Sequence, residues 1–187
     1  MEYLDFSGIK GSQQVVKNMD LSNCNFSNTD FQYTIFEYCE IANCDFTKAK
    51  LNYVYFKKCN LESSNFEGAS LKFSNFDQCV MDHTNLSNSI MNYCKLIDIS
   101  IQNSGLLTDI DFSNSRIVCK EILKNINFES ANFYNSYLDM EAHFCNFSKS
   151  NFSLANISGS IFLGCDFKHS LFDNAILGSK NMDLLSQ

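Results

Sequence analysis

The stretch that decides the fold is residues 44–66, CDFTK-AKLNY-VYFKK-CNLES-SNF, in which a large apolar residue recurs every five positions. The residue two places before each large one is small, or a valine at position 54. A period of five fits neither an α-helix nor a plain strand. It does fit a short extended piece followed by a corner, because the small and the large residue then point to the same side. A fixed short period of this kind is typical of a repeat architecture.

The same pattern extends well beyond this stretch. Of the seventeen positions from Cys24 to Ser104 that lie two before a large residue, fifteen are Ala, Cys, Ser or Thr, with Val54 and Ile99 as exceptions. The large residues, which we call centres, are Leu21, Phe26, Phe31, Phe36, Ile41, Phe46, Leu51, Phe56, Leu61, Phe66, Leu71, Phe76, Met81, Leu86, Met91, Leu96, Ile101 and Leu106.

Similar residues also recur at a spacing of twenty, which indicates four pentads per turn. We number the four expected walls 1 to 4 by the centre series that begin at Leu21, Phe26, Phe31 and Phe36. An outward series keeps the same spacing, and we call it the aromatic ladder: Tyr33, Tyr53, Phe73 and Tyr93. The sequence therefore predicts an all-β, four-sided solenoid of about eight or nine coils, each stacked only on its neighbours.

Several tripeptides resemble the pentapeptide-repeat motif A(D/N)LxX. They include Ala-Asn-Phe at 131–133, Cys-Asp-Phe at 44–46, Ala-Ser-Leu at 69–71 and Cys-Asn-Leu at 59–61, and the resemblance covers residues 4–177. It implies a right-handed quadrilateral β-helix, in which the handedness comes from the family and not from the spacing.

The whole chain, residues 1–187, is expected to form one domain. Residues 1–18 keep the phase only loosely, since Phe6 and Val16 fit whereas Gly11 and Gln14 do not, and they are expected to form an N-terminal cap. Coils follow over 19–177. A C-terminal cap is expected over 178–187, with Ser179 as the N-cap of a short helix over 180–185.

Three breaks interrupt the register of the coils. They lie near residues 105–109, within 118–125 and within 139–144, and each is either a tolerated bulge or a short binding loop. The segment 118–125 (VCKEILKN) is expected to form a bulged or partly helical corner.

The cysteines do not form a metal-binding or disulfide pattern. Eight of the nine occupy small inward positions, where a free thiol behaves like alanine, and only Cys119 does not. Their spacings are those of the repeat and not of zinc sites. We therefore expect nine free thiols, no bound metal or cofactor, and a cytoplasmic protein without a signal peptide or membrane span.

No catalytic motif is present in the sequence. The histidines His83, His143 and His169 are far apart, and His83 and His169 fall on outward corners. A glycine-rich phosphate loop, a nucleophile elbow and an HExxH motif are all missing. We expect the protein not to be an enzyme.

The charged residues are distributed unevenly over the expected walls. The net charge is −7, which argues against direct binding to nucleic acid. Between residues 20 and 98, walls 1 and 2 carry six acids against Lys48 alone, whereas walls 3 and 4 carry four acids and five lysines. We call the six acids the acidic face: Asp20, Glu40, Asp45, Glu62, Glu67 and Asp82.

Two interpretations of this surface stay open. The acidic face imitates the phosphate line of a duplex, or it is a solvated surface whose asymmetry arose by chance. The family resemblance favours the first, since quinolone-resistance members and those giving immunity to gyrase-targeting peptides look like DNA and bind type II topoisomerases. It implies DNA gyrase or topoisomerase IV as the partner, and a homodimer through the C-terminal end. The alternative is a scaffold whose aromatic ladder contacts another protein, unless the ladder only stabilises its corner.

Overall fold

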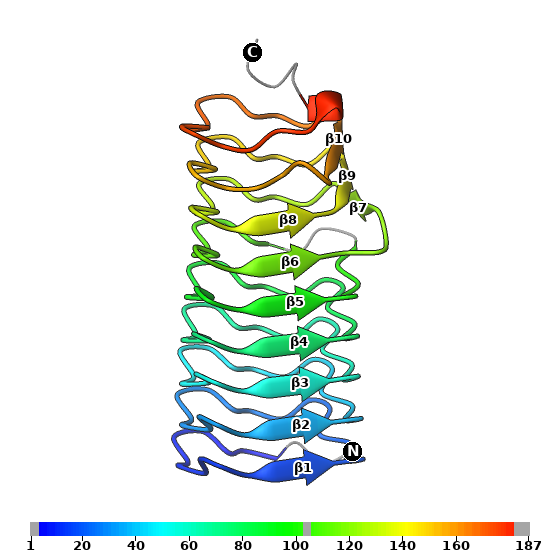
Figure 1. The fold of residues 1–187 in the computed structure, drawn as a ribbon. Coiled ribbons are helices and arrows are strands. Elements are labelled where there is room, and N and C mark those ends of the chain that lie inside the picture. The colour runs from blue at the N-terminus through cyan, green and yellow to red at the C-terminus, as the bar shows by residue number, and fades with distance from the viewer. Residues whose placement is uncertain (1–3, 103–105, 182–187) are drawn as a thin grey trace.

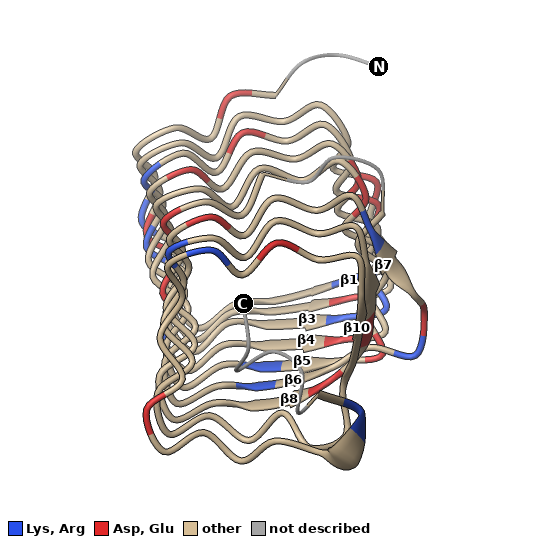
Figure 2. Ribbon diagram, turned by 90° about the horizontal axis from the view of Figure 1, so that it is seen from above, with Lys and Arg blue, Asp and Glu red and all other residues tan. Residues whose placement is uncertain are grey.

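The chain forms a straight stack of four-sided coils in a computed structural model that describes residues 4–102 and 106–181 (Figures 1 and 2). Seven short strands stack on wall 4 in the order β1-β2-β3-β4-β5-β6-β8, and β10-β9-β7 form a second sheet on wall 1. The strands are β1 Val15–Lys17, β2 Ile35–Glu37, β3 Tyr55–Lys57, β4 Asn75–Asp77, β5 Lys95–Ile97, β6 Arg116–Val118, β7 Leu123–Lys124, β8 Tyr137–Asp139, β9 Glu141–His143 and β10 Ile161–Leu163.

All pairing is parallel and joins one coil to the next. On wall 4, Phe36 of β2 is in register with Val16 below and Phe56 above, a step of twenty residues. Isolated bridges repeat this step on the other walls, as between Asp20 and Glu40. This confirms the all-β, four-sided solenoid that the period of twenty predicts.

The corners depend on one backbone conformation that recurs every five residues. The second corner residue has a positive φ, for example 63° at Asn23, 56° at Asn28 and 60° at Tyr33. Asparagine tolerates this left-handed region better than most residues, which explains its frequency at corners, whereas tyrosine is unusual there.

The interior is a file of apolar side chains. Phe36, Phe46, Phe56, Phe66 and Phe76 are each at most 1% exposed. Rings of successive coils stack in parallel, with centroids 5.0 Å apart for Phe36 and Phe56 and 4.6 Å apart for Phe46 and Phe66. Small inward residues leave room for these rings, so both inward positions of the pentad behave as predicted.

The first register break corrects one predicted centre. Leu106 is 50% exposed, whereas Leu107 is fully buried. Leu106 is bridged to Asn85, a step of 21 residues, while Val80 and Ser100 still differ by twenty. The additional residue therefore precedes Leu106 and moves the inward position to its neighbour.

The second break adds a residue to its coil, whereas the third removes one. Leu123 of β7 is the buried centre after the second break, and residues 120–121 form a bend that bulges from the stack (Figure 1). No helix forms at this corner, which is bulged only, and Cys119 is buried there, contrary to expectation. At the third break Ala142 of β9 is the buried centre, in register with Leu123 at a step of nineteen, so one residue is lost.

The two ends differ from the expected caps. Residues 5–17 form a regular coil, because β1 pairs with β2 and single bridges join Asp5 to Asn25 and Lys10 to Asp30. At the other end residues 179–181 form one 3₁₀ turn, and Asn181 donates Nδ2 hydrogen bonds to two carbonyls of the coil below. The rest of the expected helix lies outside the described residues. None of the helical structure in the described part of the chain is long and apolar enough to cross a bilayer.

Candidate partner-binding surfaces

The acidic face occupies four successive coils on walls 1 and 2. Asp20 and Glu40 are bridged neighbours on wall 1, and Asp45 lies on wall 2 between Asn25 and Asn65. The amide of Ser63, next to Glu62, donates to the carbonyl of Asp82 in the next coil. The structure therefore brings these residues together in the expected order, and Figure 2 shows acidic segments recurring from coil to coil on these walls.

Three of the six carboxylates also hold the backbone of their corners. Asp45 Oδ1 accepts the amide of Thr47 at 2.8 Å. Asp82 Oδ1 accepts the hydroxyl of Ser100 at 2.8 Å and the amide of Gln102 at 2.9 Å.

Asp20 Oδ1 accepts the amide of Ser22 at 3.0 Å, and this hydrogen bond lowers the pKa of the Asp20 carboxyl. The sequence pattern indicates all six side chains only as outward charges. This second role is not visible in the sequence, because short side-chain hydrogen bonds to the backbone do not alter the repeat pattern.

The three glutamates of the acidic face are freer. Glu40, Glu62 and Glu67 are exposed. Glu40 Oε2 accepts Nδ2 of Asn60 at 3.0 Å, and within the described residues no hydrogen bond reaches the carboxylates of the other two. These three are the carboxylates most available to a partner.

No acid of the acidic face forms an ion pair with any residue that the structure describes. Ion pairs lie elsewhere: Glu37 on wall 4 is held between Lys17 and Lys57, at 2.7 Å from each Nζ. The hydrogen bond from Lys17 and, next in size of effect, that from Lys57 lower the pKa of Glu37 to about 2. The charge of Glu37 is thus compensated by two lysines, whereas no ion pair among the described residues compensates the acidic face.

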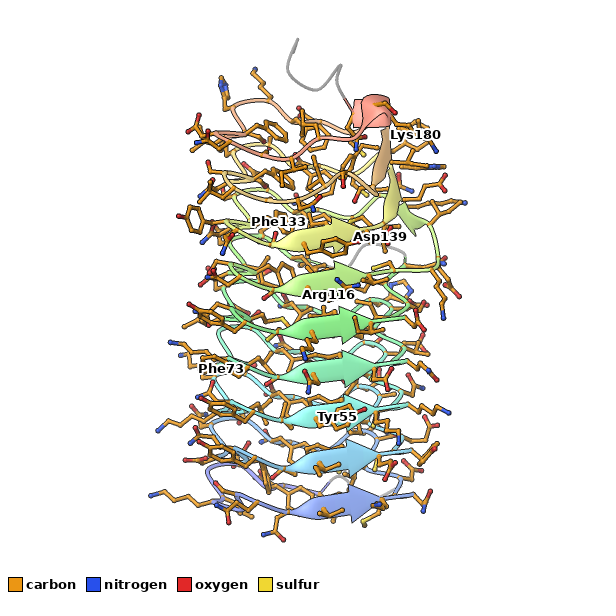
Figure 3. The ribbon with its side chains drawn as sticks, in the orientation of Figure 1. Tyr55, Phe73, Arg116, Phe133, Asp139 and Lys180 are labelled. Atoms are coloured by element: carbon orange, nitrogen blue, oxygen red, sulfur yellow. The ribbon has the colours of Figure 1, made fainter. Side chains whose placement is uncertain are left out.

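The aromatic ladder is a continuous stack on the corner between walls 3 and 4. Successive ring centroids are 4.8, 4.8 and 4.9 Å apart, with interplanar angles of 12° or less. The rings remain 41–53% exposed, and Figure 3 shows Phe73 projecting from the stack while Phe133 lies inside it. Beyond Tyr93 the same corner is occupied by Asn114 and Asn135, whose side chains are hydrogen-bonded to each other.

The described residues bring no catalytic group together. His143 Nε2 lies 2.7 Å from Glu141 Oε1 in β9, and His83 and His169 are exposed on other corners. All nine cysteines are free, and eight are buried. No group of three or more potential metal ligands occurs in the part of the chain that the structure describes.

A pentapeptide-repeat family model matches eight copies of the repeat, over residues 16–47, 24–62, 39–72, 64–103 and 142–178. The chain belongs to the pentapeptide-repeat family. The segment between these matches, 104–141, contains the first two register breaks, where the coil step of twenty is lost. No curated protein matches the chain by sequence.

A solved pentapeptide-repeat structure, that of HetL, shares the fold. HetL, involved in heterocyst differentiation regulation in the cyanobacterium Nostoc sp. strain PCC 7120, is 16% identical over 93% of this chain and 89% of HetL, with a TM-score of 0.58. Full-length QnrB1, a plasmid-mediated fluoroquinolone resistance protein, is 20% identical over 98% of this chain and 96% of its own, with a TM-score of 0.41. At 16% identity the likeness to HetL concerns the fold alone.

Proposed function

We propose that this pentapeptide-repeat protein is a non-enzymatic DNA mimic whose acidic face binds the DNA-binding surface of a type II topoisomerase, DNA gyrase or topoisomerase IV. The observation that carries the proposal is a row of carboxylates, recurring on four successive coils, that no cation of the described chain neutralises. A topoisomerase protected in this way resists quinolones or peptide toxins that act on its DNA complex.

The density of charge supports the comparison with DNA. Six carboxylates are distributed over three coil steps of about 4.8 Å, a length of about 14 Å. A B-DNA duplex carries about eight phosphates over the same length, at one charge per about 1.7 Å. Six acids minus Lys48 leave these two adjacent walls with a net charge of −5, so they offer roughly 60% of the charge density of a duplex.

The glutamates are the residues to test, because the aspartates hold corners. Replacing Glu40, Glu62 and Glu67 together by Gln removes three charges and leaves the Asn60 hydrogen bond possible, since a Gln carbonyl oxygen also accepts. Replacing Lys50, Lys72 and Lys95 together by Gln removes three charges from walls 3 and 4 and serves as the matched control.

The experiment measures binding of each full-length variant to purified gyrase and topoisomerase IV, with a supercoiling assay in the presence of a quinolone. The parent and the lysine control are expected to bind and protect, and the glutamate variant to lose both. If the parent binds neither enzyme, or if the glutamate variant binds as well as the parent, the acidic face is not a DNA mimic.

The aromatic ladder supports a second candidate function, that of a scaffold for another protein. Four exposed rings in one stack form a rigid apolar strip, and rigid aromatic side chains are the commonest anchors of protein interfaces. Replacing Tyr53 and Phe73 by Asn, the residue that occupies this corner at 114 and 135, retains the corner conformation. Loss of a partner from this variant, with the acidic face intact, would favour the scaffold.

A further inference from the structure

The first coil exposes large apolar side chains at three of its four inward small positions, and the fourth is Gln14. Coils above it mostly carry Ala, Cys, Ser or Thr there, and exceptions such as Val54 and Ile99 are buried, whereas Leu4, Ile9 and Met19 are 47%, 45% and 50% exposed. Their side chains form an apolar end face around Phe6, which is partly buried against the core. An end coil that faced only water would gain from polar residues at these positions.

The backbone of the same coil is also an open edge. β1 is the terminal strand of its sheet, and the bridges of Asp5, Lys10 and Asp20 lead only to the coil above among the described residues. The first coil therefore combines apolar side chains with an edge able to accept another strand.

We propose that this end face binds a second copy of the chain, head to head, through a two-fold axis. The first coil carries Asp20 on wall 1, Asp5 on wall 2, Lys10 on wall 3 and Lys17 on wall 4. Acids thus occupy two adjacent walls and lysines the other two. This arrangement selects one of the four two-fold axes that lie in a square end face.

The selected axis runs along the diagonal through the corner at residues 17–18 and the corner at residues 7–8. It exchanges wall 1 with wall 4 and wall 2 with wall 3, so each acidic wall meets a basic wall of the second copy. Asp5 and Lys10 lie equally far along the chain from the 7–8 corner, so Asp5 faces Lys10 of the second copy, and the reverse. The other diagonal places acid on acid, and the two remaining axes place two walls on themselves with like charges.

The same axis makes the chains antiparallel where the two end coils meet, so their free edges are able to pair as antiparallel strands. Backbone and charge therefore agree on one arrangement.

The test is the molar mass of the full-length protein by sedimentation velocity. The parent is expected to sediment as a dimer with twice the 21.3 kDa chain mass. Ile9→Asp or Met19→Asp is expected to raise the dissociation constant by on the order of a hundredfold, because each buries an unpaired charge. Leu171→Asp, a change of equal chemistry at a 53% exposed site near the C-terminal end, is the matched control and is expected to stay dimeric.

A charge exchange decides the arrangement independently of the apolar variants. Lys10→Asp and Asp5→Lys each place like charges across the axis and are expected to weaken the dimer, whereas the double variant restores both pairs and the dimer. Within one chain the double variant loses the Asp5–Ser7 hydrogen bond, so recovery of the dimer reports the contact between copies.

The proposal is overturned if the parent is monomeric up to its solubility limit, as it would be if other residues of the chain cover this face. It is also overturned if only Leu171→Asp dissociates the dimer, which would place the interface at the C-terminal end.

Discussion

The ring of Phe31 occupies the space that a side chain at Gly11 would need: a Cβ at Gly11 would lie 2.4 Å from Phe31 Cε1. Gly11 stands at an inward centre of the first coil, where every centre from 21 to 101 is a large apolar residue. The space left by the missing side chain at Gly11 is thus filled by the ring of Phe31 in the coil above. We expect Gly11→Ala to lower the free energy of unfolding by about 1–3 kcal/mol through overpacking.

The companion variant is Gly11→Ala combined with Phe31→Leu, which matches Leu51 and Leu71 on the same wall. The smaller side chain is expected to remove most of the cost in denaturant unfolding. If Gly11→Ala alone is as stable as the parent, the ring does not fill that space.

A second prediction concerns the central phenylalanine stack. Phe56 is fully buried between Phe36 and Phe76, at centroid distances of 5.0 and 5.1 Å. Phe56→Ala is expected to lower the free energy of unfolding by about 3–5 kcal/mol, through lost transfer energy and a cavity. Tyr53→Asn in the same coil, on the exposed corner, is the control and is expected to cost far less. A melting temperature unchanged in Phe56→Ala would contradict the observed registry.

The cysteines provide a chemical test of the interior. Burial raises the pKa of Cys44, Cys59 and Cys94 to about 12, which keeps these thiols protonated and slow to react. Cys165 is half-buried, and a hydrogen bond from Cys145 lowers the pKa of its thiol. Brief alkylation of the native protein is expected to modify Cys165 first, and alkylation after denaturation to modify all nine.

Mass spectrometry checks both steps, with Cys165→Ala as the control that abolishes the fast native adduct. A mass two units short for any pair of cysteines would reveal a disulfide and refute the expectation of nine thiols.

A fourth prediction follows from the ion pairs of Glu37. Its pKa is lowered to about 2 in the folded protein from an ordinary value of 4.5, by hydrogen bonds from Lys17 and Lys57. A lowered pKa means that the carboxylate stabilises the fold above pH 4.5 and that this contribution is lost as the pH falls to 2. Denaturant unfolding from pH 6 to pH 2 should show a steeper loss of stability in the parent than in Glu37→Gln. Parallel pH profiles for the two proteins would contradict this assignment.

The period of the sequence was enough to predict the walls, the inward residues and the aromatic stacks, because each pentad makes the same local choice. It was not enough at the breaks. Several registers satisfy the sequence pattern at the breaks. Only the backbone hydrogen bonds between coils place the additional residue before Leu106 and the lost residue before Ala142. The double role of Asp45 and Asp82 was hidden for a similar reason, since an outward acid and a corner-holding acid occupy the same position.

The acidic face as a DNA mimic is the central claim, and competition with DNA tests it most directly. Labelled duplex DNA bound to purified gyrase is titrated with the parent, the Glu40/Glu62/Glu67→Gln variant and the lysine control, while fluorescence anisotropy follows the DNA. The parent and the lysine control are expected to displace the duplex, and the glutamate variant to need at least about tenfold more protein.

Displacement is also expected to weaken with salt, since the Debye length falls from about 10 Å at 0.1 M to about 3 Å at 1 M. A ternary complex, in which the protein binds gyrase while the duplex stays bound, would contradict the claim, as would displacement by the glutamate variant equal to that by the parent.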